Sequence, residues 1–193
     1  MTRRLTIAAM MTVLCAGCVG LNKVTPPLRY VIEPKPAIAA VEKSEFSIAV
    51  RTLEAARPYK QNVVYREGEE LGTYSTVEWS ELPSDATTRA IVDALDASGR
   101  FKDVGSALDL ASPDLILTGQ LRRFDLVRDA EPWTAVCEIR LELRKSQGRE
   151  PVWSRTLTAV EPLEAPNNAA LPRAMNTALG RLIQEAVAAI VAN

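Results

Sequence analysis

Alternating apolar and polar residues predict β-strands along most of the chain. When the pattern repeats every two residues, successive side chains lie on opposite faces of a sheet. The stretches with this pattern are also rich in β-branched and aromatic residues, which strands favour. The stretches with this pattern are residues 29–32, 46–53, 63–66, 73–79, 115–127, 133–145 and 152–160. They predict a mainly antiparallel sheet of five to six strands. The turn at 146–151 contains Gly148 and Pro151, which predicts a hairpin of the last two stretches.

Two other segments repeat their apolar residues every three or four positions, as a helix does. The first helix is predicted over residues 84–98, with Ser84 or Asp85 as its N-cap and Gly99 at its end. The second is predicted over residues 171–191. Its apolar stripe consists of Met175, Leu179, Leu182, Ile183, Ala186, Val187, Ile190 and Val191.

This second helix has two interpretations, a core helix or one lying on a membrane surface. A surface helix needs Lys or Arg along its polar face and bulky aromatic residues opposite, whereas this one carries only Arg173 and Arg181. The pattern favours packing on the sheet. The fold class predicted is therefore mixed α+β, with two main helices packed on the sheet in a single domain over residues 29–193.

The N-terminus has the pattern of an export signal. Arg3 and Arg4 precede an apolar run over residues 5–14. A membrane-spanning helix needs about 20 residues, so this run fits the apolar core of a signal peptide instead. Residues 1–17 are predicted to be this signal.

The sequence Cys15-Ala16-Gly17-Cys18 resembles the lipobox of bacterial lipoproteins, in which cleavage before a cysteine is coupled to acylation of that cysteine. By this resemblance Cys18 carries the lipid. Cys15 occupies the place where the pattern has Leu, and its own lipidation would put Leu14 before the cut, where a small residue is expected. Ordinary secretory cleavage near Ala16 is the remaining alternative. Two or more acyl chains hold a protein stably on a membrane.

Residues 18–28 are predicted to be a lipidated tether, which reaches at most about 35 Å. Val19 follows the cysteine where an Asp would resemble an inner-membrane retention signal. This favours the periplasmic face of the outer membrane over the inner membrane.

Charge and composition exclude several classes of function. Residues 1–17 contain two arginines and no acids, so their removal changes the formal net charge from −1 to −3, with no basic excess for nucleic acid. The chain contains no histidine, which removes the usual general base and most zinc or iron ligand sets. No glycine cluster forms a phosphate-binding loop. We predict no enzyme, no metal and no cofactor apart from the lipid on Cys18.

The remaining candidates for chemistry have structural interpretations. Acidic residues alternate along strands or gather in turns, which predicts a solvated face: Glu67, Glu69, Glu70, Glu138 and Glu142. Cys137 alternates with charged residues, which favours a buried apolar side chain over a reactive or metal-binding thiol. Gly119 stands alone in a strand and predicts a bulge or close packing.

The order of features along the chain resembles the ABC-type transport auxiliary lipoprotein family. After the lipobox come a short aromatic strand at 28–34, an aromatic segment at 74–79 before Pro83, Ser-Gly-Arg-Phe at 98–101 and Leu-Thr-Gly-Gln-Leu-Arg-Arg-Phe at 117–124. The resemblance implies an accessory of an MCE-type ABC transport system for lipids or other hydrophobic molecules. Its partners would be a periplasmic MCE-domain protein with its ABC transporter, and the family also allows a homo-oligomer.

Three residues are candidates for the contact with the partner: Trp79, Tyr74 and Arg66. The alternative for Trp79 is packing in or at the rim of the core. The family's aromatic after Trp79 is missing here, since the chain reads Ser-Glu-Leu-Pro over residues 80–83.

Rival functions are an outer-membrane lipoprotein of another envelope assembly, such as a peptidoglycan synthase activator or an outer-membrane biogenesis factor, and an envelope hydrolase using carboxylates or serine. A further alternative is direct carriage of lipid inside the domain.

Overall fold

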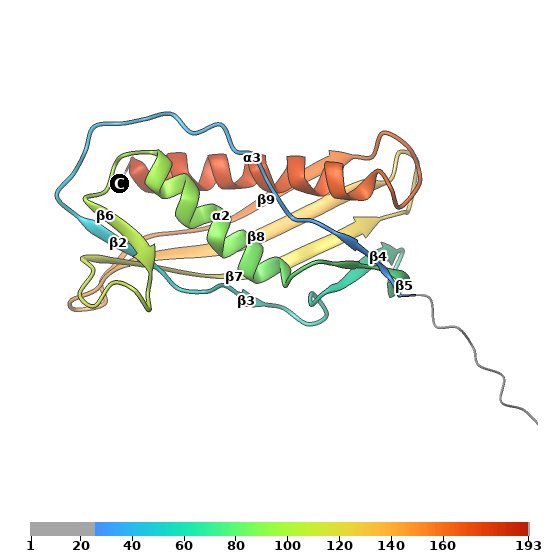
Figure 1. Cartoon of the computed structure of the whole chain (residues 1–193), viewed down its shortest axis with the longest axis horizontal. Helices are drawn as coiled ribbons and strands as arrows, with labels where there is room; N and C mark the ends of the chain where they lie inside the picture. Colours follow the sequence, from blue (N-terminus) through green and yellow to red (C-terminus); the bar gives the residue numbers. More distant parts are fainter. Residues whose placement is uncertain (1–25, 193) are drawn as a thin grey trace, which may run out of the picture.

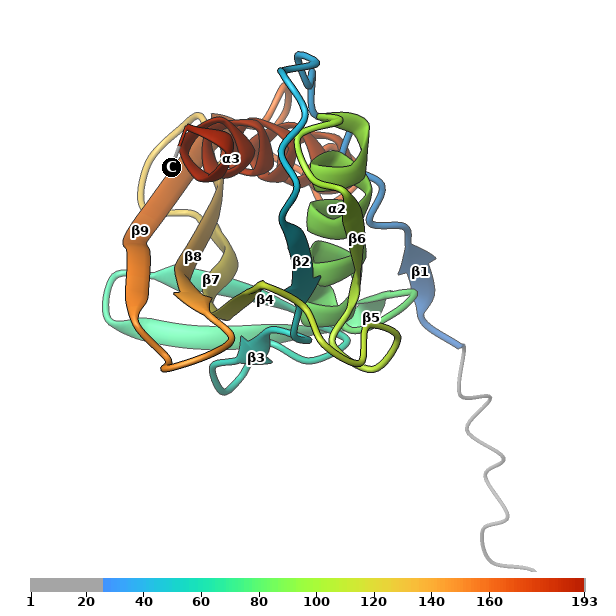
Figure 2. The ribbon, with the colours of Figure 1, turned by 90° about the vertical axis from the view of Figure 1, so that its left-hand side faces the viewer.

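A long curved sheet carries two helices on its concave face in the computed structural model, which describes residues 26–192 (Figures 1 and 2). The elements are, in chain order, β1 (Leu28–Tyr30), β2 (Ser47–Val50), β3 (Glu54–Ala55), β4 (Asn62–Glu67), β5 (Glu70–Trp79), α2 (Pro83–Ala97), β6 (Asp103–Ser106), β7 (Leu115–Val127), β8 (Thr134–Lys145), β9 (Pro151–Pro162) and α3 (Leu171–Val191). Side chains from both helices and from the concave face fill the space between them and form a continuous apolar core.

Strand β7 organises the sheet. One of its edges pairs antiparallel with β8 along almost its whole length, and β8 pairs antiparallel with β9. The other edge pairs in turn with β2, β3 and β4, all of them parallel to β7. Beyond these, β6 lies beside β2, and β5 and β1 lie beyond β4. Strands β2, β3 and β4, which are distant from β7 in sequence, therefore all lie along one edge of β7.

The predicted fold class is confirmed, with two corrections to the sheet. Within residues 26–192 the sheet has nine strands instead of five to six, and its pairings are of mixed direction. Strands β3 and β6, which lie outside the predicted stretches, have two and four residues, too few to establish an alternating pattern. Their parallel pairings join segments far apart in sequence, so no local turn signals them.

The hairpin of β8 and β9 is confirmed, and so is the side-chain alternation along β8. Cys137, Ile139, Leu141 and Leu143 are all buried on the face that bears the helices. Burial is the main cause that raises the pKa of the Cys137 thiol far above its ordinary value. Cys137 therefore behaves as a small apolar core residue.

Both predicted helices are present, and the prediction of an N-cap is wrong. Helix α2 begins with Pro83 in its first turn, and Leu82 is its N-cap without a side-chain hydrogen bond. Ser84 is thus already inside the helix, where its carbonyl accepts a hydrogen bond from the Thr88 hydroxyl at 2.7 Å. At the other end, Gly99 adopts a φ of +64° just after the helix, as predicted. Helix α3 packs on β8 and β9 and buries its apolar stripe, except for Val191, which is partly buried.

Gly119 shows the close packing predicted for it. A Cβ atom added to Gly119 would lie 2.5 Å from the backbone oxygen of Arg140 and 2.6 Å from Cδ2 of Leu141 on β8. Gly119→Ala should therefore push β7 and β8 apart and lower the free energy of unfolding by about 2 kcal/mol, as measured by denaturant titration. Gln120→Ala, at the exposed neighbouring position, is the control. Equal unfolding midpoints for the two variants would contradict the explanation.

Candidate functional site

Trp79, the first predicted contact residue, lies in the core. Its side chain is 1% exposed at the end of β5. The indole packs edge-on to Phe124 with 5.2 Å between ring centroids, and it also packs edge-on to Tyr30 with 6.1 Å between centroids. Of the two interpretations of Trp79, the structure supports packing in the core.

Tyr74 and Arg66, the other two candidates, lie half-buried on the neighbouring strands β5 and β4. The Tyr74 ring lies 5.0 Å from the Tyr65 ring, whereas Nε of Arg66 lies 3.4 Å from a carboxylate oxygen of Asp125. Adjacent residues of β4 thus belong to two polar clusters, one around Arg128 and one around Asp125.

The first cluster, here called the arginine–aromatic cluster, consists of Tyr65, Glu67, Tyr74, Arg128 and Trp133. The Arg128 guanidinium lies 3.8 Å from the centroid of the Tyr65 ring and 5.5 Å from that of Trp133. It also donates hydrogen bonds to the Tyr74 hydroxyl at 3.3 Å and to the Glu67 carboxylate. Arginine and aromatic residues are enriched where proteins bind one another, and a stacked arginine is held ready for such a contact.

The arginine–aromatic cluster was not predicted from the sequence. Its residues come together only when β4, β5 and the end of β7 lie side by side in the folded sheet. Parallel pairing sets Arg66 opposite Val127 and so brings Arg128 beside Tyr65. The one local signal is Gly72, opposite Tyr65 in the β4–β5 pair, where the Tyr65 ring occupies the space of a side chain.

The second cluster is built on Asp125, whose side chain is fully buried in β7. Arg123 donates to its two oxygens at 3.1 and 2.8 Å, and the Tyr59 hydroxyl donates at 3.0 Å. Burial raises the pKa of Tyr59, and the neighbouring Asp125 charge raises it further. With Arg66 these donors satisfy a carboxylate that has no access to water, which is the requirement for a buried charge. The cluster ties β4 and the segment before it to β7.

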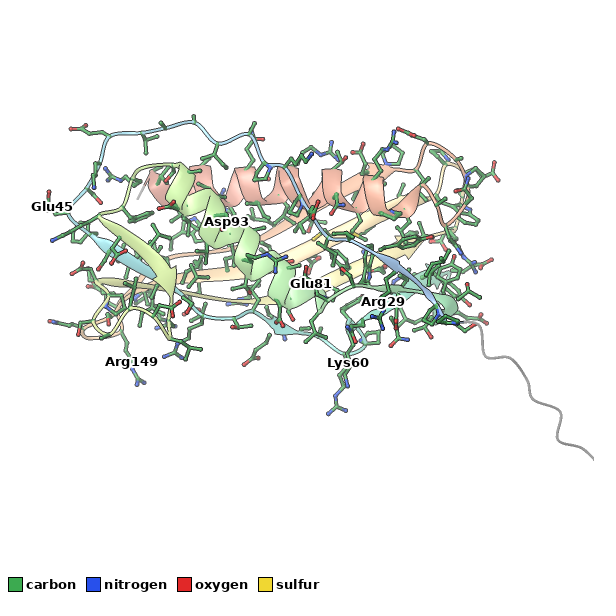
Figure 3. The ribbon with its side chains drawn as sticks, viewed as in Figure 1. Arg29, Glu45, Lys60, Glu81, Asp93 and Arg149 are labelled. Carbon is green, nitrogen blue, oxygen red and sulfur yellow. The ribbon has the colours of Figure 1, made fainter. Side chains whose placement is uncertain are left out.

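A hollow of about 560 Å³ lies at the opposite end of the domain, beside the β8–β9 turn. Apolar side chains from five parts of the chain line it: Phe46, Phe101, Leu143, Val152 and Ile190. Arg100 and Lys145 stand at its polar wall. The two ends can be located in Figure 3 by Arg29 on β1 and Arg149 in the β8–β9 turn. The volume of the hollow is in the range of small-molecule binding sites. No local sequence pattern predicts this hollow, since its lining residues are scattered along the chain.

Residues 30–187 match the family model of the ABC-type transport auxiliary lipoprotein component. The chain belongs to this family. The match runs from β1 to the last turns of α3 and so includes both polar clusters. It confirms the family that the order of sequence motifs indicated, and it places this auxiliary lipoprotein with a transport system.

Solved structures show the same fold. Protein XCC0632 from Xanthomonas campestris is 22% identical, with a TM-score of 0.75 over 84% of this chain and 94% of that one. An uncharacterized protein is 13% identical, with a TM-score of 0.61 over 85% and 97% of the two chains. The hypothetical protein CT253 from Chlamydia trachomatis is 12% identical, with a TM-score of 0.52 over 77% and 96%. No curated protein matches the chain.

The position of the predicted anchor can be related to one end of the domain. Cys15 and Cys18 lie outside the described residues, which begin at Pro26, just before β1. The turn between β4 and β5 lies at this same end of the molecule (Figure 1).

Within residues 26–192, no helix is long and apolar enough to cross a membrane, and no group of three or more His, Cys, Asp or Glu side chains could hold a metal ion.

Proposed function

We propose that this ABC-type transport auxiliary lipoprotein is a non-catalytic accessory of an MCE-type system, which moves lipids or other hydrophobic molecules across the envelope. The observation that carries the proposal is the family match over residues 30–187, which includes almost all of the described domain. In this proposal Cys18 bears the lipid and holds the domain on the periplasmic face of the outer membrane.

The domain would act by binding a protein partner. The arginine–aromatic cluster supports this role because it offers a stacked cation and three aromatic rings at the end where the chain leads to Cys18. A tether of about ten residues keeps that end within about 35 Å of the membrane. Tyr74 belongs to the cluster and Arg66 adjoins it, so both remain proposed contacts for a periplasmic MCE-domain protein.

Carriage of lipid inside the domain has less support than binding of a partner. An interior lipid site would need a lined space between the sheet and the helices, and there the side chains of the core are packed together. The 560 Å³ hollow borders the end of this core, where Phe101, Leu143 and Ile190 line it, and lies between the start of β2, the β8–β9 turn and the end of α3.

Site-specific photo-crosslinking in cells tests the proposal. A photoreactive residue at Glu67, whose side chain is 58% exposed in the cluster, should capture an MCE-domain protein. The matched control is the same residue at Arg149, in the exposed turn at the far end of the domain, which should not capture it. Recovery of a penicillin-binding protein or an outer-membrane assembly factor, without an MCE-domain protein, would contradict the proposal and favour the alternative envelope assembly.

A further inference from the structure

The 560 Å³ hollow beside the β8–β9 turn combines an apolar floor with a cationic wall. Phe101, Leu143 and Ile190, at the end of the core, are at most 8% exposed and form the floor. Phe46 and Val152 extend the apolar lining outward, and Phe46 is 55% exposed. Removing apolar surface from water is favourable, so this lining would bind an apolar group of a ligand.

Arg100 supplies a positive charge to the wall that no acid of the described structure balances. Gly99, with a φ of +64°, turns the chain out of α2, and the Arg100 carbonyl then accepts a hydrogen bond from the Ser44 N–H at 2.6 Å. Nη1 of Arg100 donates to the Glu42 carbonyl at 3.1 Å, which orients the guanidinium without neutralising it. Arg100 forms no ion pair within residues 26–192. Because a guanidinium has five N–H groups, the others can bind an anion.

Lys145 is the second cation of the wall, and Asp114 is the acid in the lining. Nζ of Lys145 donates to Glu150 at 2.8 Å, but both side chains are more than half exposed, and such a pair contributes little. Lys145 can therefore exchange Glu150 for the anionic group of a ligand. Asp114 is already occupied, since its Oδ2 accepts hydrogen bonds from the Ser47 N–H at 2.8 Å and from the Ser47 hydroxyl at 2.7 Å.

We propose that this hollow is a binding site for a small amphiphile with one apolar chain and an anionic head such as a carboxylate. The apolar chain lies on the floor, and the carboxylate accepts hydrogen bonds from Arg100 and Lys145. A volume of about 560 Å³ suits one small ligand, and a site with an apolar lining and a few placed polar groups is typical of such sites.

The ligand site is separate from the proposed contact with a protein partner. The hollow lies at the end marked by Arg149, whereas the arginine–aromatic cluster lies toward the opposite end, where Arg29 is labelled (Figure 3). It also lies at the end of the core and not between the sheet and the helices. The domain could thus bind a ligand and a partner at the same time, and either proposal can fail without the other.

Calorimetric titration with sodium decanoate and with decanol tests the class of ligand. The protein is the full mature chain, residues 18–193 with Cys18→Ala, which needs no detergent that would compete for the hollow. Decanoate should bind, and decanol, which lacks the charge, should bind on the order of tenfold more weakly. No binding of decanoate, or equal affinities for the two, would overturn the proposal. A short peptide ending in Leu presents the same carboxylate, and tighter binding of this peptide than of decanoate would overturn the assignment to a single-chain amphiphile.

Arg100→Gln tests the cation in the same titration. It should remove the preference for decanoate over decanol, because the charge that distinguishes them is gone. Arg155→Gln makes the same change at an exposed position of β9 and should keep the preference. An Arg100→Gln variant that still prefers decanoate on the order of tenfold would overturn the role of Arg100.

Val152→Trp tests the place of binding, because the larger side chain would fill part of the hollow. It should lower the affinity for both probes on the order of tenfold or more. Val160→Trp makes the same change at an exposed position of β9 and should bind both probes like the parent. Circular dichroism checks that each variant is folded. Unchanged binding by a folded Val152→Trp variant would place the ligand elsewhere and overturn the proposal.

Discussion

Asp125→Ala should lower the free energy of unfolding by about 3 kcal/mol, because it removes the carboxylate that accepts hydrogen bonds from two arginines and a buried tyrosine hydroxyl. Removing one partner of a buried ion pair leaves the others desolvated and unpaired. The Arg123 and Arg66 side chains are 31% and 34% exposed, so they can recover some hydration, which places the effect at the low end of the range for buried pairs. Urea titration of the variant and the parent protein measures the difference.

Two variants serve as controls for Asp125. Tyr59→Phe removes one hydrogen bond to the same carboxylate and should cost about 1 kcal/mol. Asp93→Ala removes an exposed acid from α2, which points to solvent in Figure 3, and should change the stability by less than about 0.5 kcal/mol. If Asp125→Ala and Asp93→Ala unfolded at the same urea concentration, the cluster would have no stabilising role.

Cys18→Ala should release the protein from the membrane fraction and abolish labelling by a fatty-acid analogue. Each buried methylene group contributes roughly 0.8 kcal/mol, so loss of the acyl chains removes far more binding energy than any single side-chain contact supplies. No helix in residues 26–192 could span a membrane in their place. Metabolic labelling and membrane fractionation measure both effects.

Cys15→Ala is the matched control for the anchor, since it removes the neighbouring cysteine and leaves Cys18 in place. It should keep both the label and the membrane association. Labelling that is lost in Cys15→Ala and kept in Cys18→Ala would reverse the assignment, whereas labelling in neither parent nor variants would favour ordinary secretory cleavage.

The β8–β9 hairpin, the sheet edge at β9 and the Asp125 cluster differ in how far they could be predicted from the sequence. The β8–β9 hairpin could be predicted because its alternation and its turn are local. That β9 is an edge could not, since edges depend on which strands pair elsewhere in the sheet. Likewise, Asp125 alternates with neighbours in β7 like any strand residue, and only the approach of Tyr59 and Arg66 shows that its side chain is buried and paired.

The sequence by itself determined both helices, the longer strands, the burial of Cys137 and the family of this lipoprotein, because periodicity, turn residues and motif order are properties of neighbouring residues. Only the tertiary structure decided that Trp79 is a core residue and that Arg128 stacks on Tyr65. These features arise from parallel pairings between segments many residues apart, and no local pattern encodes which strand will lie beside which.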